Sequence, residues 1–423
     1  MSFITPILLL LAIMRTPLFV IIAASAMIGF YSEEIDLSII SIEVYRLAEM
    51  PVLLAIPLFT FAGYLLGECN ASQRLVNLTR SLLGWLPGGL PIVTIVACAL
   101  FTAFTGASGV TIVALGALLY PALKKAGYGE NFTLGLLTSS GSLGLLFAPA
   151  LPLILYGVVA QQMDLDEAVS IDQLFLAGAL PGLLMLFLLS IYSMIQKKAQ
   201  PDDQHEAPPD AWQSLKAARW ELPLPFVILG GIYSGYFAVS EAASVTALYV
   251  LVIEVFILKE IKISRLVHII RESMMLVGGI MIILGVSMAS TNYLIDTEVP
   301  TRLFDFIQLH IESKLTFLIL LNIFLLILGM MLDIFSALVI IVPIILPIAV
   351  GYGIHPVHLG IIFLANMQLG YFTPPVGMNL FIASYRFDKS IINLYLATLP
   401  FMLILLLAVL IITYWPYLSL ALL

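Results

Sequence analysis

Residues 331–336 read Met-Leu-Asp-Ile-Phe-Ser and residues 371–379 read Tyr-Phe-Thr-Pro-Pro-Val-Gly-Met-Asn, and mostly apolar sequence lies between them. The first segment places a carboxylate, Asp333, inside hydrophobic sequence, and the second places two consecutive prolines there. A carboxylate at bilayer depth costs about 2.5–3.5 kcal/mol on insertion scales, and proline removes a helical backbone donor. A membrane protein tolerates such segments where the backbone lines an enclosed cavity. The stretch therefore predicts half of a transport site.

The composition places the whole chain in a lipid membrane. Of its 423 residues, 61% are hydrophobic and only 10% are charged. Runs of about eighteen or more apolar residues recur, as transmembrane helices require, and the short alternating segments of β-barrel spans are absent. We therefore predict an all-α polytopic membrane protein. The net charge is -8 and no basic stripe is present, so no nucleic-acid partner is expected.

Residues 105–149, nearer the N-terminus, repeat the pattern of residues 331–379. An offset of 225 residues places Ser108, within the polar segment 105–109, opposite Asp333. Repeated units with interrupted spans at matching positions indicate the binding site of a secondary transporter. At offsets of 224 to 226, the matched residues are Gly127-Tyr128-Gly129, Gly135, Leu143-Gly144 and Pro149 in the first unit, and Gly351-Tyr352-Gly353, Gly360, Leu369-Gly370 and Pro374 in the second.

Charged loops orient the spans, because Lys and Arg are retained on the cytoplasmic side. The acidic loop 31–49 is therefore predicted to lie outside, and the loops that bear Arg74 and Lys124 inside. The segment 85–123 between these basic loops must enter and leave on one side, either as two full spans or as a re-entrant hairpin. Its polar, glycine-bearing tip favours the hairpin.

The same reasoning gives the second unit the opposite orientation. Residues 131–160 cross outward as a broken helix, residues 315–350 enter from outside as a second hairpin, and residues 357–385 cross back as a second broken helix. The predicted fold is an inverted repeat with two re-entrant hairpins and two broken helices. Its predicted parts are N-terminal scaffold spans 1–84, a first transport repeat 85–162, scaffold spans 163–314 with a cytoplasmic linker 197–222, a second transport repeat 315–388 and a C-terminal span 389–423.

Hairpin tips and helix breaks expose backbone groups that lack a helical partner. Carbonyl ends with a hydroxyl or a carboxylate suit a hard cation such as sodium, whereas N–H ends suit a substrate carboxylate. The candidate cation-site residues are Ser108 with the backbone near Ser142 and Gly144 in the first unit, and Asp333, Ser336 and Thr373 in the second.

Each of these features also has a purely structural interpretation. The small residues of the 105–109 tip could form a close helix contact. Asp333 could cap a helix or pair with Arg15 or Arg302, and Pro374-Pro375 could be a plain kink.

Other polar residues in apolar runs also have open roles. Asn366 and Gln368 could contact a ligand or bridge helices. Glu254 is expected at the membrane interface, because it lies near the cytoplasmic end of its apolar run. Glu241 is expected to cap the N-terminus of its span.

The sequence contains no catalytic constellation. The five histidines fall in loops or at span ends, and HExxH and Walker-type motifs are absent. One carboxylate at bilayer depth offers no acid–base pair. The chain is therefore predicted not to be an enzyme, and the energy for transport is expected from an ion gradient or another subunit.

The sequence resembles the large membrane subunit of the tripartite ATP-independent periplasmic (TRAP) transporters over nearly the whole chain. The most specific part of the resemblance is Thr-Pro-Pro-Val-Gly at residues 373–377, with its upstream Asp. The segments that carry the resemblance are 104–109, Gly127-Tyr128, 141–144 and 331–379, with Pro57-Leu58-Phe59, Ala62-Gly63, Gly88-Gly89-Leu90 and Glu241-Ala242-Ala243.

The resemblance implies a sodium-coupled, elevator-type permease in a bacterial inner membrane, with sodium as the coupling ion and no other cofactor. It implies uptake of a small organic acid delivered by a periplasmic binding protein, and a small four-helix membrane subunit, expected here as a separate polypeptide. The ion-binding residues that it implies are Gly106, Ser108, Ser142, Gly144, Asp333, Ser336, Gly370 and Thr373, and the substrate-binding residues are Ala107, Gly109, Thr111, Ala148, Pro149, Pro374, Pro375 and Asn379.

The chain departs from the family at the first break, where residues 147–150 read Phe-Ala-Pro-Ala instead of the frequent Ile-Pro-Pro-Ser. The loss of a proline and a hydroxyl leaves the ligand geometry of the first unit open. Two other functions also stay open at this point. One is a stand-alone carboxylate or anion carrier that needs no binding protein, and the other is a non-transporting membrane scaffold subunit.

Overall fold

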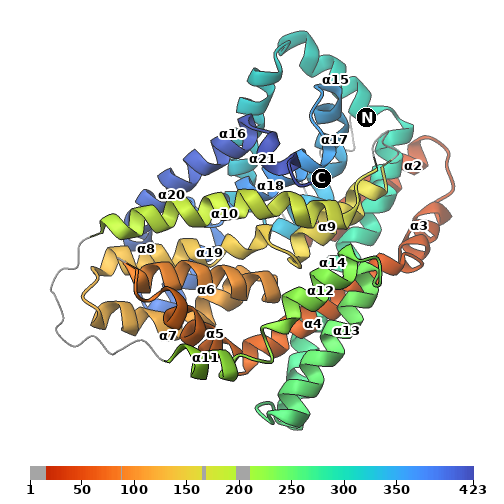
Figure 1. The fold of residues 1–423 in the computed structure, drawn as a ribbon. Coiled ribbons are helices and arrows are strands. Elements are labelled where there is room, and N and C mark those ends of the chain that lie inside the picture. The colour runs from red at the N-terminus through yellow and green to blue at the C-terminus, as the bar shows by residue number, and fades with distance from the viewer. Residues whose placement is uncertain (1–15, 87, 164–167, 197–209) are drawn as a thin grey trace.

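The structure is a computed structural model that describes residues 16–86, 88–163, 168–196 and 210–423. Every regular element in these ranges is a helix (Figure 1). Within these ranges, seven helices are long and apolar enough to cross a membrane, and one bent pair of helices brings the number to eight. The prediction of an all-α polytopic membrane protein is therefore confirmed. Arg15 and residues 197–209 of the predicted linker lie outside the described ranges.

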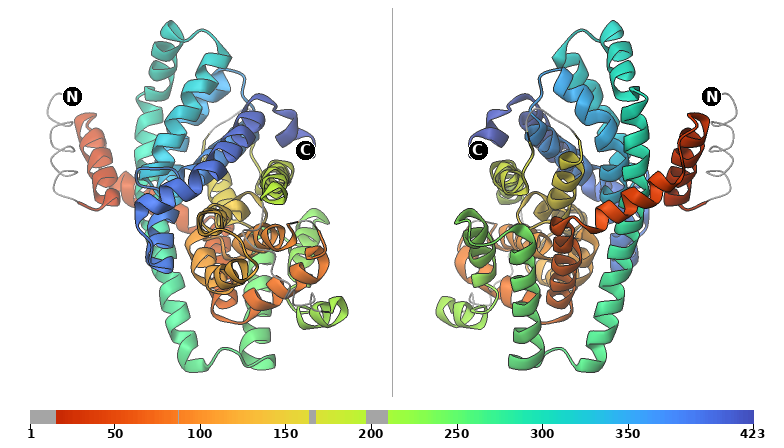
Figure 2. Two further views of the ribbon diagram at one scale, coloured as in Figure 1. Left: turned by 90° about the vertical axis from the view of Figure 1, so that its left-hand side faces the viewer. Right: turned by 90° about the vertical axis from the view of Figure 1, so that its right-hand side faces the viewer.

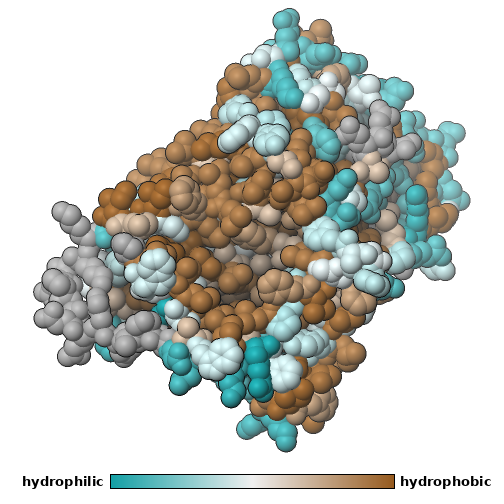
Figure 3. Space-filling view, viewed as in Figure 1, coloured by the Kyte–Doolittle hydropathy of each residue, from teal (hydrophilic) through white to brown (hydrophobic). Residues whose placement is uncertain are grey.

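Helix α14 (Ile263–Asp296) is the longest element and runs nearly the full height of the molecule (Figures 1 and 2). It packs against three N-terminal helices, and a helix from the middle of the chain packs on the third of them. In the view of Figure 3, hydrophobic residues cover most of the middle and left of the molecule, and hydrophilic residues gather mainly at its top, right and lower edges. The helices of this group are α2 (Leu18–Ser32), α3 (Ser38–Ala48), the short turn η1 (Pro51–Leu54), α4 (Ala55–Glu68), α12 (Pro223–Tyr233), α13 (Val239–Leu251) and its continuation η3 (Val252–Ile257). We call this group the scaffold.

Two segments that were predicted as loops form amphipathic helices instead, and a third amphipathic helix lies in the region 163–314 that was expected to hold scaffold spans. Helix α3 lies in the acidic loop 31–49, α5 (Ala71–Leu83) lies in the basic loop that bears Arg74, and α15 (Val299–His310) follows α14. Each is short and partly polar and turns apolar residues inward on one side, buried in α5 and half-buried in α3 and α15, which a search for long apolar runs does not detect. Helices α5 and α15 each immediately precede a hairpin.

Two units with the same order of helices make up most of the rest of the fold. The first comprises α6 (Gly89–Thr105), α7 (Ser108–Lys125), α8 (Glu130–Ser140), η2 (Leu143–Leu146) and α9 (Leu151–Gln161); the second comprises α16 (Lys314–Met331), α17 (Ile334–Gly351), α18 (Pro356–Gly370) and α19 (Met378–Phe387). Helices α7 and α17 are both 18 residues long, and the turn after each contains a glycine with positive φ, Gly127 or Gly353. The helices thus align at an offset of 226 residues. The predicted match of Gly127 with Gly351 is wrong by two residues, because Gly127 corresponds to Gly353.

The two units exchange contacts with each other. Helix α7 of the first unit packs on α19 of the second, and α17 of the second packs on α9 of the first. The long helices that follow the units, α10 (Ile171–Ile195) and α20 (Ile391–Tyr414), cross over in the same way, since α20 packs on α8 and α10 on α18. A two-fold relation between repeats produces such exchanged contacts. The chain ends at α21 (Tyr417–Leu420), which lies against α10 and α18.

The scaffold touches the units mainly through α4 and α14. Helix α4 packs against α6, and α14 packs against α17. Gly63 of α4 lies so close to the end of α6 that a Cβ added there would be 2.7 Å from the Cα of Thr105. The scaffold therefore meets the first unit beside its tip.

Candidate functional site

The first tip is a two-residue turn between α6 and α7. Helix α6 ends before Gly106, which adopts a φ of +65°, a left-handed conformation that favours glycine. The N–H of Gly106 donates to the carbonyl oxygen of Thr102 at 2.7 Å. Ala107 is half-buried, and the buried Ser108 donates its hydroxyl hydrogen to Oδ1 of Asn379 at 2.8 Å. The tip of the first unit therefore contacts the start of α19 in the second unit.

Buried hydroxyls tie the first tip to the break between α8 and α9. The Oγ1 atoms of Thr102 and Thr111 lie 2.6 Å apart, and Thr102 donates to the carbonyl oxygen of Gly141 at 2.8 Å. The structure thus uses the hydroxyl of Thr111, a predicted substrate residue, to join α7 to α6. Gly109, another predicted substrate residue, faces α19, where an added Cβ would lie 2.7 Å from Cδ1 of Ile382.

The first break spans residues 141–150 and reaches the second unit. Ser142 is fully buried and donates its hydroxyl hydrogen to the carbonyl oxygen of Gln368 in α18 at 3.3 Å. Pro149 is buried, Ala148 is half-buried, and the peptide bond between them is cis. The segment Glu130–Leu146, which comprises α8 and η2, is bent by 41° relative to α9.

Asp333 occupies the second tip, between α16 and α17. Its Oδ1 accepts hydrogen bonds from the N–H groups of Phe335 and Ser336, each at 3.0 Å. Asp333 is therefore the N-cap of α17, which was one of its two structural interpretations. It is half-buried, and Ser336 is buried. The cap engages one of the two carboxylate oxygens, so capping and cation binding are compatible.

A short path of hydrogen bonds connects the two tips through the second break. The N–H of Asn379 donates to the carbonyl oxygen of Tyr371 at 2.8 Å. The hydroxyl of Tyr371 accepts a hydrogen bond from the N–H of Ile334 at 2.8 Å. Since Ser108 bonds Asn379, and Ile334 follows Asp333, the first tip, the second break and the second tip are joined.

The second break spans residues 371–377, and its surface is partly open. Thr373 donates its hydroxyl hydrogen to the carbonyl oxygen of Leu369 at 2.8 Å. Thr373 and Pro374 are half-buried, whereas Pro375 is exposed. The peptide bond between the two prolines is cis.

A glycine at each break allows the backbone to approach the first helix of the same unit. A Cβ added to Gly144 would lie 2.3 Å from a carbonyl oxygen of α6, and a Cβ added to Gly370 would lie 2.5 Å from the Cα of Gly329 in α16. Gly144 and Gly370 correspond at the offset of 226 residues. Both were predicted as ion-site residues, and the structure explains them by close packing.

Buried polar atoms without a hydrogen-bond partner gather beside the breaks. They include Ser140 Oγ at the end of α8, and Asn366 Oδ1 and Gln368 Oε1 near the end of α18. Each of these side chains is at most 1% exposed. Hard cations take oxygen ligands of this kind, and an orphaned buried acceptor requires some partner. Oxygen atoms of the type that a hard cation takes are therefore present in the helices that lead into the two breaks.

Asn366 also bridges helices. Its Nδ2 donates to Oδ1 of Asn322 in α16 at 2.7 Å, and Thr413 of α20 donates to the same oxygen at 3.0 Å. Helix bridging, one of the two open roles of Asn366, is therefore observed. Asn366 Oδ1 stays without a partner.

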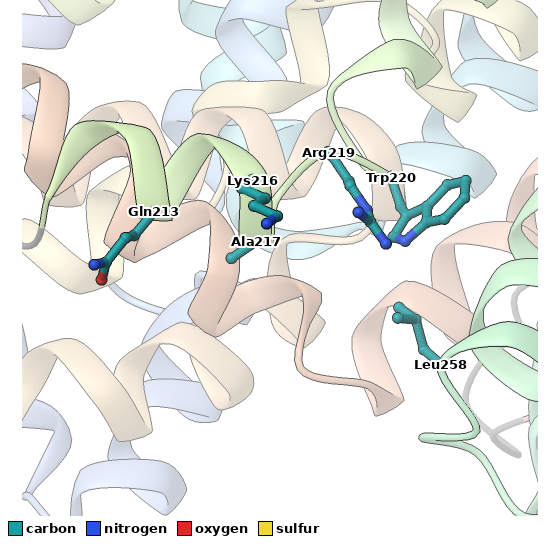
Figure 4. A pocket seen from close by; sticks show the side chains of 6 residues that line it. All are labelled: Gln213, Lys216, Ala217, Arg219, Trp220 and Leu258. Atoms are coloured by element: carbon teal, nitrogen blue, oxygen red, sulfur yellow. The ribbon is translucent and has the colours of Figure 1, made fainter.

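A hollow lies apart from these residues, beside α11 (Ala211–Ala217). The guanidinium of Arg219 is 5.0 Å from the ring centre of Trp220 at this hollow. None of the predicted site residues lines it. The lining residues are Gln213, Lys216, Ala217, Arg219, Trp220 and Leu258 (Figure 4).

A comparison with known families decides the class of protein. Residues 5–418 match the family described as "Tripartite ATP-independent periplasmic transporter, DctM component". The chain belongs to this family. It is the large permease subunit of a TRAP transporter, as the resemblance implied, and no catalytic family is indicated.

Curated TRAP permeases match most of the chain. A "C4-dicarboxylate TRAP transporter large permease protein DctM" of Pseudomonas aeruginosa is 33% identical over 90% of this chain and 88% of its own length. A "Sialic acid TRAP transporter large permease protein SiaM" of Vibrio cholerae is 31% identical over 88% of this chain and 86% of its own. An "Isethionate TRAP transporter permease protein DctMQ" of Oleidesulfovibrio alaskensis is 34% identical over 86% of this chain but 57% of its own length.

The TRAP permease also shares its fold with a solved transporter. The structure titled "Crystal structure of the Alcanivorax borkumensis YdaH transporter reveals an unusual topology" aligns with a TM-score of 0.65 at 16% identity. The alignment covers 89% of this chain and 87% of that one. At this identity the likeness concerns the fold alone.

Four residues of the site escaped the sequence analysis, and one of them is Ser140, whose hydroxyl oxygen has no hydrogen-bond partner. Thr102 and Tyr371 form the hydrogen bonds described above, and the carbonyl oxygen of Thr138 accepts from Nδ2 of Asn379 at 3.4 Å. Thr102 lies one helical turn before the first tip, and Tyr371 opens the second break. A search for polar groups within one helical turn of each predicted tip or break would have found these residues.

Proposed function

We propose that this permease takes up a small organic acid in symport with sodium, by an elevator movement of the two units against the scaffold. The hydrogen-bonded path from Ser108 through Asn379 and Tyr371 to Ile334 carries the proposal. It joins helix ends whose free carbonyl and N–H groups suit a cation and an anion. Relatives named for C4-dicarboxylates and for sialic acid favour an acid as the substrate.

Sodium is proposed to bind at the tips and breaks rather than at a separate metal centre. The residues proposed to hold it are those implied by the resemblance, together with the unpartnered oxygens of Ser140 and Gln368. The bound cation would supply positive charge beside the substrate carboxylate. The half-buried Ala107 and Pro374 and the exposed Pro375 offer an approach for the acid, and Asn379 lies behind them.

The moving body in this proposal contains α10 and α20 as well as the two units. Both helices pack mainly on the units. This favours a moving body larger than the two transport repeats, 85–162 and 315–388, that were expected from the sequence. The exchanged contacts support units of opposite orientation, with the tips re-entrant. The sliding surface would then lie where α4 meets α6 and where α14 meets α17.

Two partners and a location complete the proposal. A periplasmic binding protein would deliver the acid, and a small four-helix membrane subunit, as a separate chain, would complete the complex. A bacterial inner membrane is the corresponding location. The support for all three is membership of the tripartite periplasmic family.

Uptake into proteoliposomes tests the proposal. The permease is reconstituted with and without its small subunit, the binding protein and radiolabelled acid are added outside, and an inward sodium gradient is imposed. Uptake is expected only with both partners and with the gradient. Equal uptake after sodium is replaced by choline would contradict the coupling, and uptake by the permease alone would favour a stand-alone carrier.

A further inference from the structure

Arg74 of α5 is surrounded by three glutamates from distant parts of the chain. Its Nε donates to Oε1 of Glu221 at 2.5 Å, and one terminal nitrogen lies 3.1 Å from Oε1 of Glu254. The other terminal nitrogen donates to Glu260. Glu221 precedes α12, Glu254 lies in η3, and Glu260 lies in the turn before α14. The cluster thus joins α5 to three segments of the scaffold.

The charges of this cluster do not balance. Three carboxylates surround one guanidinium, so the net charge is -2 when all are ionised. The side chains of Glu221 and Glu254 are only 2% and 1% exposed. Arg265 does not compensate them, because it pairs with Glu68 at 2.8 Å. Each glutamate pairs with Arg74, but one guanidinium does not balance three carboxylates, so a bound proton or a bound cation would relieve the excess negative charge.

Two independent observations point to a ligand. Oε2 of Glu221 is buried and has no hydrogen-bond partner. In addition, the Sγ of Cys69 and carboxylate oxygens of Glu254 and Glu260 all lie within 4.8 Å of one another. The ligands of a tetrahedral zinc ion are about 3.5 Å apart, so small side-chain rotations would bring these atoms to a metal.

We propose that Cys69, Glu254 and Glu260 bind one divalent cation of the zinc class. A thiolate with carboxylates is a donor set that Zn²⁺ accepts. With Cys69 bound as a thiolate, the cation brings the net charge of the cluster from -2 to -1. The ion can enter past Glu260, whose side chain is 19% exposed.

Cobalt spectroscopy tests the thiol ligand. Co²⁺ is titrated into the metal-free, purified full-length permease, and the thiolate-to-cobalt absorption in the near ultraviolet is recorded. One equivalent is expected to saturate the signal. Cys69→Ser should abolish it, whereas Cys98→Ser should leave it unchanged, because Cys98, the other cysteine of the sequence, lies in α6. No signal in the unchanged protein, or a signal that persists in Cys69→Ser, would overturn the proposal.

Zinc calorimetry tests the carboxylates separately. Glu260→Gln is expected to weaken Zn²⁺ binding at least about tenfold, since a ligand is lost. Glu272→Gln is the matched control, because Glu272 pairs with exposed His268 at 2.8 Å and would affect only a surface site. Zinc should also raise the thermal unfolding midpoint of the permease. Equal loss of binding in Glu260→Gln and Glu272→Gln would assign the zinc to the surface pair and refute the cluster site.

Discussion

At the scale of single residues, Asp333 combines a helix cap with a negative charge. The cap is visible in the bonds from Phe335 and Ser336, whereas the charge is the part that sodium coupling needs. Asparagine also accepts hydrogen bonds at an N-cap. Substitutions at this one position can therefore separate the two roles.

We predict that Asp333→Asn abolishes sodium-stimulated uptake and leaves the stability of the permease nearly unchanged. Asp333→Ala should abolish the same stimulation and also lower the free energy of unfolding by about 0.5–2 kcal/mol, the usual cost of a lost cap. Uptake in proteoliposomes and denaturant unfolding measure the two effects. Sodium stimulation that survives in Asp333→Asn would leave this residue with a capping role only.

The hydrogen bond between Ser108 and Asn379 gives a second prediction. In a double-mutant cycle with Ser108→Ala and Asn379→Ala, the coupling energy should be about 1 kcal/mol, because the two side chains bond directly. Chemical unfolding of the four proteins measures it. Ser25→Ala, which removes a hydroxyl that bonds within its own helix, should combine additively with Ser108→Ala. Additivity of Ser108 and Asn379 would mean that the tip and α19 are not bonded in the folded protein.

Residue-level expectations succeeded where the chemistry was local. A cap for Asp333 was one of the expected roles, and Glu241 was expected to cap its span, where its carboxylate accepts from the N–H of Ala238 at 2.9 Å. Glu254 lies near the end of its span, as expected, but its partner was not foreseen, because it is buried beside Arg74, 180 residues away in sequence. A local sequence pattern cannot reveal a partner that is so far away along the chain.

At the scale of elements, the sequence predicted the breaks better than the connecting helices. Prolines inside apolar runs marked both breaks, since proline cannot donate within a helix. Helices α3, α5 and α15 were missed because each is short and polar on one side, so its stability depends on the surface that it covers. The close packing at Gly144 and Gly370 could not be predicted from the sequence either, because it depends on which helix packs against each glycine.

That packing gives a third prediction. Gly144→Ala should lower the free energy of unfolding by about 1–3 kcal/mol, as overpacking does, because the new methyl would meet the backbone of α6. Gly129→Ala is the matched control, since nothing lies within 4 Å of its added Cβ and its φ is -60°. The two variants are compared by thermal unfolding in the same detergent. Equal stability would mean that the first break does not pack against α6.

At the scale of the whole molecule, the exchanged contacts between the two units could not be predicted from the sequence. The repeat predicted two similar units, but not that α7 packs on α19 or α17 on α9. Nor did it predict that α10 and α20 join the units, because their apolar composition suits any neighbour in lipid. These contacts define one body, and α4 and α14 define the surface against which we propose it moves.

The central claim is that this body carries the site past the scaffold, and a disulfide across the boundary tests it most directly. Gly67 of α4 faces α7, where an added Cβ would lie 3.1 Å from Cγ1 of Val110, so cysteines at the two positions would be close enough to be tested as a disulfide pair. The pair Gly67→Cys and Val110→Cys is introduced into a permease whose native cysteines are replaced by serine. The single variants and the reduced protein serve as controls.

Oxidation is expected to stop sodium-driven uptake in the double variant, reduction should restore it, and the single variants should transport in both conditions. If the oxidised double variant takes up the acid as fast as the reduced one, α7 does not move past α4, and the elevator account is contradicted.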